Sequence, residues 1–141
     1  MTIKEIQEEI IDEFSVFDDW MERYEYMIDL GKSLEIIDDT NKVDANLIKG
    51  CQSKVWIHAD LKDNKIHFSA DSDAILTKGI VALVLRVFSD QKPVAILDAD
   101  TEFINEIGLK EHLSPTRANG LVSMLKQIKL YALAYQSKLT E

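Results

Sequence analysis

The hydrophobic period changes twice along the chain, and this order constrains the fold more than any single motif. Near the N-terminus, apolar residues recur at helical spacing, at Ile3, Ile6, Ile10, Phe14 and Phe17 and again at Trp20, Tyr24, Met27 and Ile28. This spacing predicts two helices, each with one buried face. Thr2 and Glu5 have the spacing of a capping box for the first helix. Gly31 is expected to end the second in a left-handed cap.

Alternation replaces helical spacing in the middle of the chain. Over residues 55–61 and 66–70 every second residue is apolar, which is the spacing of strands with one buried face. The Asp63-Asn64 pair between the two segments favours a tight turn, so we expect an antiparallel hairpin. Residues 45–48 are a candidate third strand.

Helical signals return after the hairpin. Asp71-Ser72-Asp73 supplies side-chain oxygens that predict the N-cap of a long helix reaching Phe88. This helix is apolar on nearly all sides, so we expect it at the centre of the domain. A short helix is expected over residues 101–107, ended by Gly108.

The last helix has the clearest start signal in the chain. Ser114-Pro115 places a capping hydroxyl before a proline at the first helical position, and the helix should run to about Lys138. The order of elements predicts one α+β domain over residues 1–141. Its helices would pack on one face of a small antiparallel sheet of about three strands.

The acidic composition excludes several classes of partner. The chain has 141 residues, a formal net charge of -9 and 46% hydrophobic residues. This composition is typical of a globular protein and opposes nucleic-acid binding, because phosphates require a basic surface. Anionic membranes are disfavoured for the same reason, and the longest apolar run, residues 79–87, is too short to span a bilayer. A single cysteine without a recognisable signal peptide favours the reducing cytoplasm.

The histidines and carboxylates do not have the spacing of a metal site. The three histidines and one cysteine lack zinc-ligand spacing. His58 and His67 fall on facing strands, where we expect a solvated cross-strand pair. Asp71 and Asp73 resemble the start of a calcium loop, but the glycine and the closing glutamate of that loop are missing. We therefore predict neither a metal nor a cofactor in this chain.

Cys51 is the only cysteine, and it follows a glycine just before the first predicted strand. One thiol cannot form an internal disulfide, but as a thiolate it can carry one transferable atom. The simpler interpretation is a small buried hydrophobic residue. A Cys–His hydrolase would require a nearby imidazole, and the predicted strand carries His58 away. Arg117 falls in the first turn of the last helix, where a cation opposes the helix dipole, and this placement hints at a function.

Three motifs occur in order and cover nearly the whole chain. They are Gly50-Cys51-Gln52-Ser53 before Val55-Trp56, Asp71-Ser72-Asp73-Ala74 with Lys78-Gly79, and Leu113-Ser114-Pro115 with Arg117 and Asn119-Gly120. Together they resemble the SufE family, sulfur acceptors for cysteine desulfurases in iron–sulfur cluster assembly. Trp20, Arg23-Tyr24 and Leu30-Gly31 match the N-terminal pattern of the family. The chain departs from the common pattern at Lys54, where many members have glutamine, and at Ile48-Lys49.

The resemblance implies a fold and a site. The fold is a compact α+β domain related to the scaffold proteins of cluster assembly. Cys51 would accept the persulfide sulfur at the tip of a loop, with Asp73 and Arg117 in support. The loop and partner surface would include Gly50, Gln52 and Ser53. We expect this loop to be tucked in at rest and to swing out when a partner docks.

The resemblance also implies partners. The sulfur donor would be a pyridoxal-phosphate-dependent cysteine desulfurase of the SufS or CsdA type, and the acceptor would be an iron–sulfur scaffold complex. The protein itself would hold no cofactor and would turn over no small molecule alone. One alternative is an adaptor that activates the desulfurase allosterically, with Cys51 incidental. A cluster scaffold is the other, although such scaffolds use several thiolates.

Overall fold

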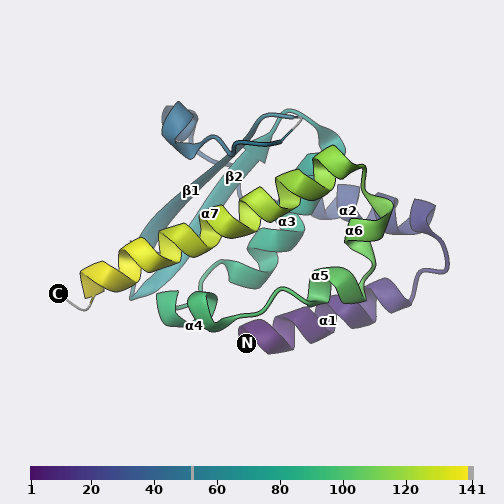
Figure 1. Ribbon diagram of the computed structural model, residues 1–141, viewed down its shortest axis with the longest axis horizontal. Coiled ribbons are helices and arrows are strands. Elements are labelled where there is room, and N and C mark those ends of the chain that lie inside the picture. The colour runs from purple at the N-terminus through teal and green to yellow at the C-terminus, as the bar shows by residue number, and fades with distance from the viewer. Residues whose placement is uncertain (52, 140–141) are drawn as a thin grey trace.

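The long helix α7 and the central helix α3 both pack against a two-stranded sheet in the computed structural model (Figure 1), and Tyr131 and Tyr135 of α7 donate hydrogen bonds to the backbone of this sheet. The structure describes residues 1–51 and 53–139. The helices are α1 Ile3–Ser15, α2 Trp20–Lys32, α3 Ile75–Phe88, α4 Pro93–Asp98, α5 Phe103–Glu106, α6 Leu109–His112 and α7 Pro115–Leu139. Two 3-10 turns, η1 Asp39–Asn41 and η2 Asp44–Asn46, precede the strands β1 Val55–Lys62 and β2 Lys65–Ser72. This is the predicted α+β order.

The hairpin is confirmed, but the described residues form two strands rather than about three. Asp63 and Asn64 make the turn with φ of 52° and 64°, as a tight hairpin requires. The candidate strand at residues 45–48 is wrong because η2 occupies its first half. A bridge from Leu47 to Trp56 joins the end of this segment to β1 without extending into a strand.

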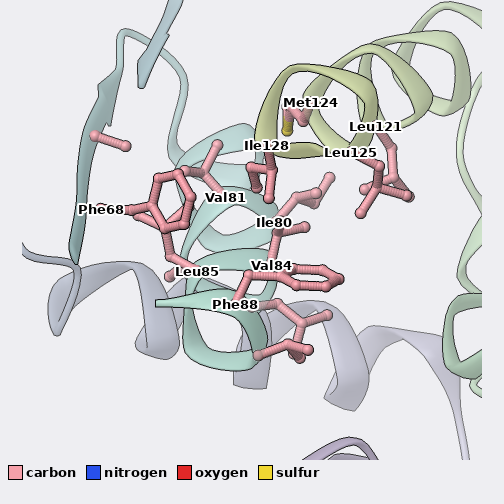
Figure 2. Packing of buried hydrophobic residues seen from close by; sticks show 14 of the residues in the cluster. Phe68, Ile80, Val81, Val84, Leu85, Phe88, Leu121, Met124, Leu125 and Ile128 are labelled. Carbon is pink, nitrogen blue, oxygen red and sulfur yellow. The ribbon is translucent and has the colours of Figure 1, made fainter. Parts of the chain in front are cut away.

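The core lies between the sheet and the helices on one of its faces. Figure 2 shows Phe68 of β2 facing Val81 and Leu85 of α3, while Ile128 of α7 packs on the opposite side of α3. The inward residues of both strands are buried, namely Val55, Ile57, Ala59, Ile66, Phe68 and Ala70. Helix α3 is buried from Gly79 to Leu85, which confirms its central position.

Helices α2 and α3 approach each other through two glycines. The predicted left-handed cap at Gly31 is wrong: α2 continues to Lys32, and its C-cap is Ser33. A Cβ on Gly31 would lie 3.1 Å from the backbone nitrogen of Gly79. Gly31 therefore serves close helix packing rather than helix termination.

The N-cap predicted for α3 is also wrong. The cap residue is Ala74, which provides no side-chain hydrogen bond. Ser72 Oγ accepts from the backbone N–H of Ala74 at 3.3 Å, before the helix begins. The carboxylate of Asp73 turns away from the helix to a neighbouring loop, and this contact belongs to the site described below.

The C-terminal elements largely follow prediction. Ser114 Oγ accepts from the backbone N–H of Arg117 at 3.3 Å, so the start of α7 is confirmed. Gly108 has φ of 74° and separates α5 from α6. The sequence reasoning missed α4, although Pro93 occupies its first turn.

In the part of the chain that the structure describes, no helix is both long and apolar enough to cross a membrane.

The expected His58–His67 pair does not form. The strand register places His58 opposite Ser69 and His67 opposite Asp60. His58 contacts Asp60 on its own strand at 3.1 Å. Within residues 1–51 and 53–139, no group of His, Cys, Asp and Glu side chains is arranged to hold a metal ion.

His67 makes folding stability depend on pH. Its Nδ1 lies 2.8 Å from Asp90 Oδ1, and its Nε2 contacts Glu35. The hydrogen bonds with Asp90 and then Glu35 raise the pKa of His67 above its ordinary value of 6.5. This stabilisation is therefore fully present below pH 6.5 and is lost as the pH rises through the raised pKa.

His67→Gln is expected to flatten the pH dependence of the free energy of unfolding around neutrality. The loss at acidic pH should be below about 1 kcal/mol, because the cluster is accessible to solvent. Urea unfolding of both proteins across a pH series measures the difference. Parallel stability–pH curves for the two proteins would contradict this account.

Candidate functional site

Cys51 lies at the tip of a short loop that leads into β1. The loop begins after Ile48, whose backbone N–H donates to the carbonyl of Val55 at 2.8 Å. Gly50 turns the chain with φ of 88°, a left-handed backbone conformation that glycine adopts without steric cost. The backbone pairing at the base leaves the cysteine on a tight turn.

Asp73 holds the other side of this loop. Its Oδ1 accepts from the backbone N–H of Lys54 at 3.0 Å. Its own N–H donates to the carbonyl of Lys54 at 3.2 Å. Asp73 therefore ties the segment after Cys51 to the chain that leads into α3. Among the ion pairs of the described residues, none joins Asp73 to Arg117.

Asp71, in the same motif, forms an ion-pair cluster beside the loop. Its carboxylate contacts Lys42 Nζ at 2.8 Å and Lys78 Nζ at 3.5 Å. Burial alone would raise the pKa of the Asp71 carboxyl. The hydrogen bonds from Lys42 and from the Ser72 backbone, together with the positive charges of Lys42 and Lys78, outweigh burial and lower this pKa. These motif residues thus stabilise the end of β2 rather than facing the thiol.

The thiol of Cys51 packs against a glycine in α7. A Cβ placed on Gly120 would lie 3.0 Å from Sγ and 3.5 Å from Cα of Cys51. The side chain is half-buried in this contact. Burial raises the pKa of the Cys51 thiol above its ordinary value, because the thiolate loses hydration. At rest the sulfur is therefore mainly a protonated, weakly nucleophilic thiol.

A small cavity of about 10 Å³ adjoins this sulfur. That volume corresponds to about one water-sized sphere. The walls come from the cysteine loop, α3 and α7, and they consist of Cys51, Ser53, Thr77, Ile80, Arg117, Gly120 and Met124. Because so much of this lining is apolar, the cavity suits a small, weakly hydrated atom.

Arg117 contributes to the cavity from the first turn of α7. Its side chain is otherwise exposed. No salt bridge of the described residues involves its guanidinium. The cation is thus available to an anion at Cys51 or on a partner.

Residues of the N-terminal pattern position the segment that leads into α7. The Trp20 ring stacks on His112 with centroids 3.9 Å apart. The Tyr24 hydroxyl donates to the carbonyl of His112 at 2.5 Å. An Arg23 Nη donates to the carbonyl of Ile107 at 3.3 Å. Helix α2 therefore fixes α6, and through it the start of the helix that carries Arg117.

The structure brings together most of the residues named from the sequence. Cys51, Ser53 and Arg117 line one cavity, Gly50 forms the turn and Asp73 holds the loop base. Gln52 lies outside the described residues. None of the three histidines lines this cavity, so its described lining offers no imidazole base for a Cys–His hydrolase.

Sequence reasoning missed the contributions of α3 and α7 to the walls, in particular Thr77, Met124 and the packing role of Gly120. One signal was available. Glycine inside a helix costs about 0.5–1 kcal/mol relative to alanine. A glycine within the first turns of α7 therefore indicates that another chain segment approaches closely.

The chain is similar to known proteins in sequence and in fold. Residues 8–132 match the SufE family, described as an Fe-S metabolism associated domain. An uncharacterized SufE-like protein of Rhizobium meliloti is 42% identical, over 86% of this chain and 91% of that protein. Another, from Synechocystis, is 39% identical over 90% of this chain and 80% of its own length. The fold matches the solution structure of a hypothetical protein from Thermus thermophilus, with a TM-score of 0.78, 18% identity, and coverage of 94% and 96% of the two chains.

Proposed function

Because the chain belongs to the SufE family and thus to proteins associated with iron–sulfur metabolism, we propose that it is a sulfur acceptor and carrier. It takes sulfane sulfur from a cysteine desulfurase onto Cys51 and delivers it to an iron–sulfur cluster scaffold. The observation that carries this proposal is a lone thiol on a glycine turn, seated beside a cavity with room for about one atom. We place this activity in the reducing cytoplasm, where such a thiol stays free.

The transfer is a thiol–disulfide type of exchange. The Cys51 thiolate attacks the outer sulfur of the persulfide on the desulfurase, and a new S–S bond forms on Cys51. The S–S bond of the donor breaks, and its cysteine leaves as a thiolate. The proton lost from Cys51 passes to that thiolate or to solvent. Pyridoxal phosphate belongs to the partner, so this chain moves sulfur without a cofactor of its own.

Burial separates a resting state from a reactive one. Desolvation holds the pKa of the Cys51 thiol high while the sulfur rests on Gly120. Withdrawal of the loop from α7 on docking would hydrate the sulfur and restore its thiolate fraction. The same contact with Gly120 would shield a bound persulfide from other thiols after the partner leaves.

Arg117→Ala is expected to slow sulfur transfer about fivefold to tenfold, which corresponds to about 1 kcal/mol of lost transition-state stabilisation. The guanidinium at the cavity would favour the attacking thiolate and the anionic product. Rates of persulfide formation at fixed desulfurase concentration measure the effect, and Arg117→Lys should retain most of the rate. An Arg117→Ala rate equal to that of the wild type would show that Arg117 takes no part in sulfur transfer.

The proposed function is tested by alanine release from free cysteine by a SufS-type or CsdA-type desulfurase. Added wild-type protein should raise the turnover rate several-fold, because it removes sulfur from the desulfurase cysteine. No rise with either type at excess carrier would contradict the proposal. An adaptor that activates the enzyme without carrying sulfur would also raise the rate, and the variant of Cys51 considered in the Discussion separates the two.

A further inference from the structure

Thr77 is buried without an evident structural reason. Its side chain is 6% exposed, and the only other polar side chain in the buried set of described residues is Gln7. Gln7 is satisfied, because its Nε2 donates to the carbonyl of Asp100 at 3.0 Å. The hydroxyl of Thr77 has no hydrogen-bond partner among residues 1–51 and 53–139. Among the described residues, the fully enclosed side-chain atom that lacks a partner is Arg23 Nε, so the Thr77 oxygen is not sealed off and is open to the cavity that this residue lines.

Thr77 lines the cavity beside the Cys51 sulfur. It is the third residue of α3, which begins at Ile75 without a side-chain cap. The positive end of the helix dipole therefore lies close to this wall of the cavity and favours a negative charge there. Ile80 and Met124, on other parts of the lining, provide no hydroxyl or N–H side-chain donor.

A persulfide would add one atom to this cavity. The outer sulfur lies about 2 Å from Sγ. The cavity beside Sγ holds about 10 Å³, which is room for about one small atom. In the resting state Thr77 makes no hydrogen bond with the thiol itself, so the hydroxyl remains available to an atom added beyond it.

We propose that the Thr77 hydroxyl donates a hydrogen bond to the outer sulfur of a Cys51 persulfide and holds this sulfur, as an anion, inside the cavity. This inference rests on the proposed function, since it concerns the sulfur that the carrier would bear. Ser53 also lines the cavity, but its side chain is only partly buried, so water competes for its hydroxyl. Thr77 is more deeply buried than either Ser53 or the exposed Arg117, the other lining residues with side-chain donors, and it is the stronger candidate for holding the sulfur inside the cavity.

Thr77→Val tests the hydrogen bond, because valine keeps the branched shape and removes the hydroxyl. The matched control is Thr77→Ser, which keeps the hydroxyl and removes a methyl group. Each protein is loaded by a desulfurase with free cysteine, separated from the enzyme and followed by intact mass. Two properties are then measured: the rate at which a small thiol removes the sulfur, and the pH midpoint for alkylation of the persulfide.

We expect Thr77→Val to lose its sulfur about tenfold faster than the wild type, because a hydrogen bond to a charged group is lost. The pH midpoint for alkylation should move upward, since the anion loses its donor. Thr77→Ser should resemble the wild type in both measurements. Equal rates and midpoints for wild type and Thr77→Val would overturn the inference while leaving the carrier function intact. A wild type that gains no sulfur would overturn both.

Thermal unfolding distinguishes this role from a structural one. Thr77→Val removes a buried hydroxyl, so its resting form should unfold at the same temperature as the wild type or higher. A variant that is at least as stable but holds sulfur poorly supports a ligand-binding hydroxyl. A variant that unfolds earlier and loses sulfur no faster than Thr77→Ser would assign Thr77 to packing.

Discussion

Replacement of Cys51 by serine is expected to abolish sulfur acceptance and the stimulation of a cysteine desulfurase that depends on it. A serine hydroxyl does not ionise near neutral pH and forms no stable bond to sulfane sulfur, so no persulfide can form. Alanine release in the presence of Cys51→Ser should return to the rate of the desulfurase alone. The mass of the variant should stay unchanged after incubation with desulfurase and cysteine.

The loss should not come from unfolding. Oxygen is smaller than sulfur, and the contact with Gly120 tolerates a smaller atom, so the free energy of unfolding should change by less than about 1 kcal/mol. Ser53→Ala is the matched control on the same loop, and it should still accept sulfur. If Cys51→Ser stimulated the desulfurase as well as the wild type does, the protein would be an allosteric adaptor with an incidental cysteine.

Gly79→Ala is expected to cause the largest loss of stability of the substitutions considered. A Cβ on Gly79 would lie 2.2 Å from the carbonyl oxygen of Met27 and 2.7 Å from its carbonyl carbon. Both are backbone atoms of α2, so a whole helix must shift to relieve the clash. We expect a loss of about 3 kcal/mol or more in the free energy of unfolding, the upper end for overpacked cores. The midpoint of urea unfolding measures it.

Gly31→Ala is the matched control on the facing helix. Its Cβ would lie 3.1 Å from the backbone nitrogen of Gly79, so the facing backbone would have to shift by only a few tenths of an ångström. Helix propensity alone favours alanine over glycine by about 1 kcal/mol at both sites, so a large loss at Gly79 reflects the clash. A Gly79→Ala protein as stable as the wild type would show that α2 and α3 are not held in this close contact.

The fold was predictable where neighbouring residues determine an element. Ser114-Pro115 defines the start of α7 because the hydroxyl and the proline act within one turn. The Asp63-Asn64 turn is likewise local. Gly31 was misassigned because a glycine suits a helix cap and a close helix contact equally well. Only its position opposite Gly79 decides between these roles, and that proximity arises from the tertiary fold.

The candidate site also combines features that neighbouring residues determine with features that only the tertiary fold determines. Gly50 and Cys51 could be identified from the sequence, because a glycine turn beside a lone cysteine is a local feature. Asp73 was named through a family resemblance, but its hydrogen bond to Lys54 joins two separate segments. Thr77 could not be found, because the cavity that it lines exists only where the loop, α3 and α7 meet.

Intact-protein mass spectrometry tests the carrier function most directly. The wild-type protein is incubated with a cysteine desulfurase and free cysteine, and its mass is recorded before and after treatment with a reductant. We predict a gain of one sulfur atom, located on the peptide that contains Cys51 and removed by the reductant. An unchanged mass, while the desulfurase still turns over faster, would contradict the claim that Cys51 carries sulfur.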